Sequence, residues 1–415
     1  MFSVYLYDRP IGVIERIRSG IRFTYTPDAV DDPALHAVSV SLPKRIEPYG
    51  NRQAAPFFQN LLPEQAYKRL VRAAAETDPS DDIGLLGAIG GECPGAVSIW
   101  PGDERPSDVP EYRILSDDAL EALFSPAGAP ELGRAVTRGR LSLPGVQQKI
   151  ALLRRPDGTW VLPLGGGITS HILKQPITEF PELLENELFC TTLAEKAGLL
   201  VPRTGLAAPT VRVSCAERFD RPMSEASGGA GRVKVHQEDF CQMRGVLPDK
   251  KYERDGGPGI AACAHVVRVH AALPARDLPN LLRWVAFNCF IGNEDAHAKN
   301  LAFLYTRAGL RLAPFYDLVS TVVYDHLERT LAMKIGGSWD VRNVQAGDWR
   351  SLAERMGLPW DVARPLILET ADALTSHLGD VTAYCASSYG PAEVYSHIGT
   401  VAERHVKQTE RELTS

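Results

Sequence analysis

The chain has 415 residues, which at about 150 residues per domain predicts two or three domains. Hydrophobic residues make up 44% and charged residues 23%, an ordinary globular composition that excludes a disordered or fibrous chain. Lys and Arg number 45 against 51 Asp and Glu, so the formal net charge is −6, whereas a free-standing nucleic-acid binder usually carries a basic excess.

We expect neither a membrane-spanning segment nor an export signal in this sequence. No apolar run approaches the roughly 18 residues that a membrane helix needs, and residues 1–9 lack the basic start and apolar centre of a signal peptide. The seven cysteines are scattered, odd in number and without a C-x-x-C pair, which argues against a disulfide framework or a structural zinc site. We therefore expect a cytoplasmic protein that does not contact a membrane.

The first hundred residues predict a small module of strands and helices. Apolar and polar residues alternate at 2–7, and strand-like stretches follow at 12–16 and 21–25, so we expect an antiparallel meander. The stretch 63–76 has a helix-forming composition, with Pro63 suited to the first helical turn. A proline-rich, charged stretch at 101–110 is where we expect this module to end.

The middle of the chain predicts short strands. Residues 150–153 and 160–162 are typical of a hairpin, because the sequence Arg-Pro-Asp-Gly between them is a strong turn signal. Residues 171–174 predict a third strand. A helix is expected after Pro181, with Gly198 just past its end.

Beyond about residue 242 the chain is mostly helical, with one strand-like interruption at 301–312. Strands followed by helices predict an α+β body of two lobes after the N-terminal module.

The strongest functional signal is the polar sequence Gly-Asn-Glu-Asp-Ala-His-Ala-Lys-Asn at 292–300, directly after an apolar helical stretch. Asp295 and Asn300 have the D-x-x-x-x-N spacing of a protein-kinase catalytic loop, where the acid accepts or orients a hydroxyl proton and the amide oxygen holds Mg²⁺. Charged groups beside a core helix are costly unless they line a site. Asp317, seventeen residues after Asn300, lies where kinases have a metal-binding aspartate. An isolated aspartate at such a position would more often be a helix N-cap.

A kinase also needs a phosphate cradle and a cation upstream. Residues 141–149 lie where a loop over the nucleotide is expected, but they contain one glycine and are not a G-x-G-x-x-G loop. Lys174 ends an apolar strand, as the phosphate-pairing lysine of kinases does. Glu185 or Glu187 on the next helix could pair with it, at most one of them because they lie on different helix faces.

Residues 234–242 connect the sheet-like part to the helical part. A hinge there would offer backbone groups to an adenine, and a capped helix start at Glu238 and Asp239 is an equally good interpretation.

Together these segments resemble the HipA family of bacterial serine/threonine kinase toxins. The resemblance covers most of the chain, and its motifs occur in one fixed order, which is more specific than any motif alone. They lie at 41–43, 60–64, 95–96, 142–149, 171–174, 217–221, 236–242, 295–300 and 314–317.

The resemblance implies a small N-terminal α/β module at 1–108, then a two-lobed protein-kinase-like fold of the phosphatidylinositol-kinase kind. The implied lobes are a mixed α/β nucleotide-binding lobe at 109–240 and a mostly helical catalytic lobe at 241–415. It also implies ATP with Mg²⁺, and a protein hydroxyl as acceptor.

By the same resemblance, Asp295 is the expected catalytic base, and Asn300 and Asp317 are the expected magnesium ligands. The implied ATP-binding residues are Pro144, Gly145, Val146, Gln147, Gln148, Lys149, Lys174, Glu238, Asp239, Phe240, His297, Ala298, Lys299, Asn300, Tyr316 and Asp317. Two positions depart from the family: Pro144 replaces a smaller residue, and Glu294 adds a second carboxylate beside the expected base.

Ser142 stands at the position of the family's autophosphorylated loop serine. Because a phosphate there would repel a bound triphosphate, we expect phosphorylation of Ser142 to switch the enzyme off. The resemblance further implies a HipB-like helix-turn-helix antitoxin that holds most of the operator DNA, and an aminoacyl-tRNA synthetase as substrate, so that translation stalls and the cell enters growth arrest or persistence.

Two other functions share part of this pattern. A small-molecule phosphotransferase of the aminoglycoside-kinase kind would lack the N-terminal module and the Ser142 loop. A catalytically inactive co-repressor that binds the antitoxin agrees less well with the complete set Lys174, Asp295, Asn300 and Asp317. Two hydrolase classes are excluded: the S-x-x-K at 41–44 lacks the partner motifs of the penicillin-binding class, and no H-E-x-x-H of a zincin occurs.

Overall fold

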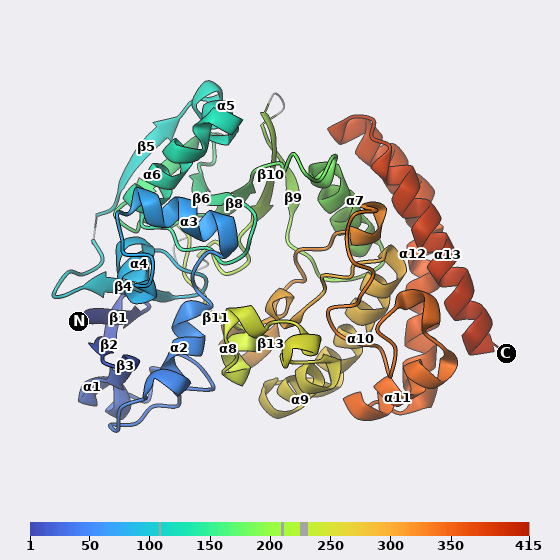
Figure 1. The fold of residues 1–415 in the computed structure, drawn as a ribbon, viewed down its shortest axis with the longest axis horizontal. Helices are drawn as coiled ribbons and strands as arrows, with labels where there is room; N and C mark the ends of the chain where they lie inside the picture. The colour runs from blue at the N-terminus through green and yellow to red at the C-terminus, as the bar shows by residue number, and fades with distance from the viewer. Residues whose placement is uncertain (108, 209–210, 225–230, 415) are drawn as a thin grey trace. The chain divides into compact units, whose positions relative to one another are not determined.

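The computed structural model describes residues 1–107, 109–208, 211–224 and 231–414. The chain forms two compact units, each assembled from three stretches of sequence (Figure 1). The first unit contains Met1–Gln175, Leu206–Asp249 and Leu304–Thr306, and the second contains Pro176–Gly205, Lys250–Phe303 and Arg307–Ser415. The division into domains at 1–108, 109–240 and 241–415 stays a prediction.

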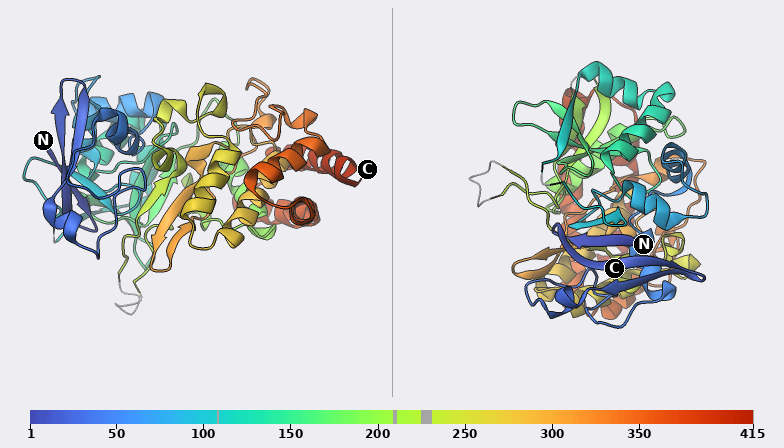
Figure 2. Two further views of the ribbon diagram at one scale, coloured as in Figure 1. Left: turned by 90° about the horizontal axis from the view of Figure 1, so that it is seen from below. Right: turned by 90° about the vertical axis from the view of Figure 1, so that its left-hand side faces the viewer.

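The first unit begins with a four-stranded sheet in the order β3-β2-β1-β4. Its strands are β1 (Phe2–Leu6), β2 (Arg9–Ile17), β3 (Gly20–Tyr25) and β4 (Val97–Pro101). Alternate residues of β1 are buried, as the sequence pattern predicts, and the antiparallel meander of β1 to β3 is confirmed. Strand β4 pairs antiparallel with β1 and is the last strand of this sheet. Figure 2 (right) shows the sheet beside the N-terminus.

Four helices accompany this sheet: α1 (Pro27–Asp31), α2 (Asn51–Gln59), α3 (Gln65–Ala74) and α4 (Asp82–Ile89). The prediction that Pro63 lies in the first turn of α3 is wrong, because the helix begins at Gln65. Pro63 instead forms a parallel bridge with Gly145, in which the N–H of Glu64 donates to the Gly145 carbonyl at 3.0 Å. This bridge keeps residues 63–64 extended.

A second, six-stranded sheet has the order β5-β7-β6-β8-β10-β9. Its strands are β5 (Glu111–Leu115), β6 (Lys149–Arg154), β7 (Trp160–Leu164), β8 (His171–Lys174), β9 (Thr204–Ala208) and β10 (Val211–Glu217). The predicted hairpin is β6–β7, and the predicted third strand is β8. Helices α5 (Asp117–Phe124) and α6 (Ala129–Gly139) pack on this sheet, and β11 (Gln237–Asp239) leads into α8 (Phe240–Arg244).

The second unit is mostly helical, as the sequence predicts. Its helices are α7 (Leu183–Lys196), α9 (Ile260–His270), α10 (Pro274–Ile291), α11 (Ala346–Met356), α12 (Trp360–Tyr389) and α13 (Val394–Thr414). Helix α10 is buried along most of its length and packs against α12 and α13, which run side by side in Figure 1. The strand-like stretch at 301–312 is a hairpin of β12 (Ala302–Thr306) and β13 (Gly309–Leu312).

Single turns of 3-10 helix complete the described structure, at Pro126–Gly128, Pro248–Lys250, Glu253–Asp255, Ala298–Asn300, Thr321–Val323 and Val341–Asn343. All seven cysteines are buried and none is joined in a disulfide. In the described ranges, every helix is too short or too polar to cross a membrane. The predicted α+β class, with an N-terminal sheet module and a helical C-terminal region, is confirmed.

Candidate active site

The loop at residues 292–300 leaves α10 through a glycine that other residues cannot easily replace. Gly292 ends the helix with φ of 67°, and a Cβ atom at this position would lie 2.3 Å from a methyl group of Val322. Its carbonyl accepts hydrogen bonds from the N–H groups of Thr321 (3.0 Å) and Val322 (3.2 Å). The start of this loop is therefore bound to the segment that follows Asp317.

Asn293 connects the two segments that carry the predicted catalytic residues. Its Oδ1 accepts from the N–H of Asp295 at 3.1 Å, and its Nδ2 donates to the carbonyls of Asn288 (side chain, 2.7 Å) and Asp317 (backbone, 3.4 Å). The side chain is buried, so these bonds do not compete with water. Asn293 thus fixes the backbone of Asp295 relative to that of Asp317.

Asn300 and Asp317 come together from positions 17 residues apart, with Nδ2 of Asn300 at 3.3 Å from Oδ2 of Asp317. Asn300 Oδ1 accepts from the N–H of His297 at 3.0 Å, which closes the single turn at 298–300. Asp317 has φ of 55°, a left-handed conformation that non-glycine residues adopt at a cost of about 1–3 kcal/mol and that is concentrated at functional sites. No helix starts at Asp317, so the N-cap interpretation does not apply.

Asp295 is the exposed acid of this loop, with 55% of its side chain accessible to solvent. The hydroxyl of Tyr252 donates to its Oδ1 at 2.7 Å, and Nε2 of the buried His297 lies 3.9 Å from the same oxygen. A carboxylate held at the edge of a buried polar loop can accept a proton from a hydroxyl that approaches from solvent.

The donor set at Asn300 and Asp317 fits Mg²⁺. An amide and a carboxylate offer the hard oxygen ligands that Mg²⁺ prefers, and this ion usually takes only one or two protein ligands, with water and phosphate completing its shell. Across residues 1–107, 109–208, 211–224 and 231–414, no cluster of three or more His, Cys, Asp or Glu side chains could hold a metal by itself.

Glu294, next to Asp295, is buried, so it is not a second exposed acid of this loop. Its N–H donates to the Thr321 hydroxyl at 2.8 Å, and its carbonyl accepts from the N–H of Ala332 at 2.9 Å. Burial raises the pKa of its carboxyl to about 7, although Arg329 favours the charged form. The second carboxylate expected beside the base is thus only partly ionised at neutral pH.

In the first unit, the predicted ATP loop is docked on the N-terminal module. The buried Ser142 hydroxyl donates to the Leu61 carbonyl at 2.7 Å, and its N–H donates to the Glu92 carbonyl at 3.0 Å. Further along, Gly145 accepts from Glu64, and the buried hydroxyl of Tyr67 donates to the Lys149 carbonyl. Four hydrogen bonds to residues 61–67 and to Glu92 therefore hold residues 142–149 in place.

Two lysines meet at the end of this loop. Lys149 and Lys174 are direct partners across the antiparallel strands β6 and β8, and the ammonium of Lys149 donates to the Pro144 carbonyl at 3.0 Å. Of the two glutamates expected as partners of Lys174, Glu187 is buried on α7 and Glu185 is half-buried. Their pairing with Lys174 stays a prediction.

The predicted hinge begins with a buried acid. Glu238 accepts from the N–H of Val40 (3.1 Å) and from the hydroxyls of Ser39 and Tyr305, and burial raises its pKa to about 7. The carboxylate of Glu238 is thus hydrogen-bonded to the N-terminal module and to β12. Asp239 caps α8 through a capping box with Gln242, so the helix-start interpretation is confirmed here, while the hinge role stays a prediction.

The predicted site residues therefore fall into two groups. The second unit brings together Asp295, His297, Ala298, Lys299, Asn300, Tyr316 and Asp317, with the Tyr316 hydroxyl donating to the Lys299 carbonyl at 2.6 Å. The first unit holds Ser142, Pro144, Gly145, Val146, Gln147, Gln148, Lys149, Lys174, Glu238, Asp239 and Phe240. Sequence reasoning missed Asn293, Tyr252 and Tyr67; only Asn293, inside the polar loop, carried a local signal.

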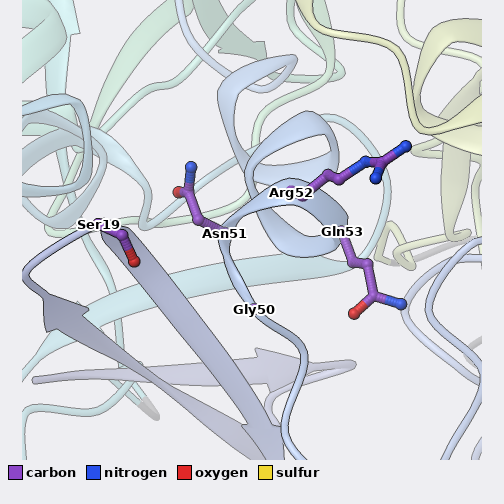
Figure 3. A pocket seen from close by; sticks show the side chains of 5 residues that line it. All are labelled: Ser19, Gly50, Asn51, Arg52 and Gln53. Atoms are coloured by element: carbon purple, nitrogen blue, oxygen red, sulfur yellow. The ribbon is translucent and has the colours of Figure 1, made fainter.

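A separate hollow of about 730 Å³ lies in the N-terminal module (Figure 3). It is lined by Ser19, Gly50, Asn51, Arg52 and Gln53. None of the predicted site residues contributes to it.

Known proteins resemble this chain in sequence and in fold. A family model described as the HipA N-terminal domain matches residues 2–100, and one described as the HipA-like C-terminal domain matches residues 141–378. The chain is 36% identical over 396 residues to a Sinorhizobium fredii protein named as kinase Y4mE, covering 92% of this chain and 93% of that protein. It is 28% identical over 321 residues to the serine/threonine-protein kinase toxin HipA of Shewanella oneidensis, covering 74% and 72%.

Among solved structures, a chain of the Shewanella oneidensis MR-1 complex of HipA, HipB and operator DNA has the same fold. The TM-score is 0.83 at 22% sequence identity, over 100% of this chain and 98% of that chain. The C-terminal family model alone matches more than half of the sequence, and the N-terminal model matches the module before it. The chain therefore belongs to the HipA family.

Proposed function

We propose that this chain is a serine/threonine protein kinase that uses ATP and Mg²⁺. The observation that carries the proposal is the convergence of Asn300 and Asp317, whose side chains lie 3.3 Å apart, together with an exposed acid, Asp295, on the same loop as Asn300. This order and spacing of acid, amide and second acid is that of kinase catalytic centres, which act by positioning and electrostatic stabilisation. Relatives named as kinases, Y4mE and HipA of Shewanella oneidensis, support it.

Each side chain then has a distinct task. Asp295 orients the acceptor hydroxyl and takes its proton, while Asn300 and Asp317 hold Mg²⁺, which when bound neutralises charge on the transferring phosphoryl group. In the first unit, residues 144–149 and Lys174 bind the phosphates, and the backbone at 238–240 meets the adenine. His297, Lys299 and Tyr316 belong to the nucleotide site of the second unit.

We also propose that Ser142 is phosphorylated by this activity and that the modification switches the enzyme off. Its hydroxyl is buried and bonded to Leu61, so it can reach a catalytic centre only after the loop leaves its docked position. Once phosphorylated, it would not return to that position, because burying a phosphate against the acceptor carbonyl of Leu61 is costly.

Membership of the HipA family supports a proposal for the cellular role. We propose that the chain is the toxin of a pair with a HipB-like helix-turn-helix antitoxin, that the antitoxin provides most of the contact with operator DNA, and that the substrate is an aminoacyl-tRNA synthetase. The solved relative is a complex of HipA, HipB and operator DNA, and the net charge of −6 agrees with a DNA contact made mainly by the partner. Such a toxin would act in the cytoplasm, inhibit translation and promote growth arrest or persistence.

The test is mass spectrometry of the purified chain after incubation with Mg²⁺ and ATP, with an Asp295→Asn variant beside it. Phosphate on Ser142 that requires Asp295 would support both the kinase and the loop proposals. The matched control is Asp325→Asn, at a fully exposed aspartate whose loss should change nothing. A chain that neither binds ATP nor acquires phosphate would be an inactive co-repressor, and transfer to aminoglycosides alone would identify a small-molecule phosphotransferase.

A further inference from the structure

A tyrosine outside every motif contacts the proposed catalytic base. The hydroxyl of Tyr252 lies 2.7 Å from Oδ1 of Asp295, 43 residues further along the chain. This is the usual length of a hydrogen bond from a hydroxyl to a carboxylate, and a bond to an ionised group is stronger than one between neutral groups. Tyr252 therefore acts directly on the one exposed acid of the catalytic loop.

The backbone places this hydroxyl, so the contact does not depend on a flexible side chain alone. The residue after Tyr252, Glu253, donates its N–H to the carbonyl of Ala332 at 3.0 Å, and Ala332 donates its own N–H to the carbonyl of Glu294 at 2.9 Å. The carboxylate of Glu253 also accepts from the N–H of Lys334 at 2.9 Å. The neighbours of Tyr252 and Asp295 are thus bound to the same short segment, 332–334.

The ring of Tyr252 is held as well. It packs edge-on against the ring of His297, with centroids 5.4 Å apart at an interplanar angle of 70°, and the ammonium of the buried Lys251 lies 5.4 Å from its centroid. Contacts of both kinds favour one ring orientation. Because a tyrosine has only two side-chain torsions, fixing the ring fixes the line along which the hydroxyl can point.

This arrangement divides the two oxygens of Asp295 between two tasks. Oδ1 accepts the bond from Tyr252, whereas Oδ2 accepts no hydrogen bond from any residue that the structure describes. An exposed aspartate without such a contact samples several rotamers, and only some of them suit an incoming hydroxyl. With Oδ1 bound to Tyr252, the carboxylate keeps one orientation, and Oδ2 is the oxygen left for an incoming hydroxyl.

We propose that Tyr252 is a positioning residue for phosphoryl transfer, and that it holds the carboxylate of Asp295 so that Oδ2 receives the acceptor proton. The inference rests on the proposed kinase function. In the reaction, the acceptor oxygen forms a bond to the γ-phosphorus, the bond from that phosphorus to the β–γ bridging oxygen breaks, ADP leaves, and the acceptor proton passes to Oδ2. Tyr252 keeps its own proton throughout.

The test is the Tyr252→Phe variant of the full chain, assayed for phosphate incorporation over a range of ATP concentrations. The ring and its packing remain, so we expect ATP affinity and the melting temperature to be unchanged while kcat falls about 10- to 100-fold, as small misplacements of a catalytic group do. A purely structural role would instead lower the melting temperature. The control is Tyr384→Phe at an exposed tyrosine of α12, which should match the wild type.

Three outcomes would overturn the inference. If the wild type is active and Tyr252→Phe has the same kcat, the positioning role of Tyr252 is overturned and the proposed kinase function is not. Phosphate found by mass spectrometry on Tyr252 itself would have the same consequence, because the hydroxyl would then be an acceptor. A wild-type chain that shows no phosphoryl transfer dependent on Asp295 would overturn the proposed function and this inference together.

Discussion

The hydroxyl of Ser142 donates a hydrogen bond of 2.7 Å to the backbone carbonyl of Leu61, and Ser142 has no exposed surface. Ser142, two residues before the predicted ATP loop at 144–149, is thus buried against the N-terminal module. A phosphoserine brings close to two negative charges and three acceptor oxygens, and the carbonyl of Leu61 is itself an acceptor. Docking of the loop and phosphorylation of Ser142 therefore exclude each other.

Ser142→Asp should reproduce the phosphorylated state, because a buried carboxylate facing a carbonyl is repelled. We expect its ATP affinity to fall at least about tenfold and protease cleavage to appear within residues 141–149. Ser142→Ala loses one hydrogen bond, worth about 1 kcal/mol, and should keep the loop docked. Limited proteolysis and calorimetric titration with ATP check both variants. Wild-type ATP affinity and protection in Ser142→Asp would contradict the exclusion.

Tyr67→Phe should loosen the other end of the same loop. The buried hydroxyl of Tyr67 donates to the carbonyl of Lys149, and its removal leaves that carbonyl without this donor. We expect KM for ATP to rise severalfold, about 1 kcal/mol in binding, with kcat nearly unchanged because the second unit is untouched. Tyr5→Phe, whose hydroxyl makes a long exposed bond to Glu104, is the matched control. A change in kcat alone would contradict a role in nucleotide binding.

The sequence predicted what local chemistry decides. Alternation of apolar residues located β1, the turn residues at 155–158 located the β6–β7 hairpin, and Gly198 marked the end of α7. The D-x-x-x-x-N spacing likewise pointed to Asp295 and Asn300, which lie in one short loop, and their catalytic role stays a prediction.

Long-range pairing could not be predicted in this way. β4 pairs with β1 across more than ninety residues, and nothing in Val97–Pro101 specifies that partner. Pro63 was expected inside a helix from composition, but a bridge to Gly145, far along the chain, keeps it extended. Tyr252 likewise bonds to Asp295 from 43 residues away, so its role has no local signature. Tertiary contacts override local propensity at these positions.

A buried ionic cluster in the first unit should control its acid stability. Glu92 accepts from Arg218 (3.3 Å) and Arg221 (3.0 Å), and Asp220 pairs with both arginines (2.6 and 3.0 Å), all of them nearly inaccessible to solvent. Burial alone would raise the pKa of Asp220, but Arg218 and Arg221 lower it to about 2 from its ordinary 3.8. The pKa of Glu92 is lowered for the same reason.

Glu92→Gln leaves two buried arginines short of a negative charge, so we expect a loss of about 3–5 kcal/mol in the free energy of unfolding. Because the folded-state pKa values are depressed, the stability that Asp220 contributes is complete above pH 3.8 and is lost as the pH falls towards 2. Urea unfolding at several pH values measures both effects. Glu131→Gln, which breaks an exposed pair with Arg134, should cost at most about 0.5 kcal/mol. Equal losses in the two variants would contradict the argument.

Glu238 should give the opposite pH dependence, because burial raises its pKa from 4.5 to about 7. Between these values the folded chain binds more protons than the unfolded chain, so the contribution of Glu238 to stability is complete below pH 4.5 and is lost as the pH rises to about 7. Glu238→Gln keeps an acceptor for the N–H of Val40 and the hydroxyl of Tyr305 but does not titrate.

The stability of Glu238→Gln relative to the wild type should therefore rise between pH 4.5 and 7 and stay level above that. The buried His236 does not disturb this comparison, because burial lowers its pKa to about 3, below the range in which Glu238 titrates. Chemical unfolding at half-unit pH steps gives the difference directly, and Glu111→Gln on an exposed edge of β5 should show none. Parallel stability curves for Glu238→Gln and the wild type would mean that Glu238 stays ionised in the folded chain, and that the predicted hinge is built around a buried charge.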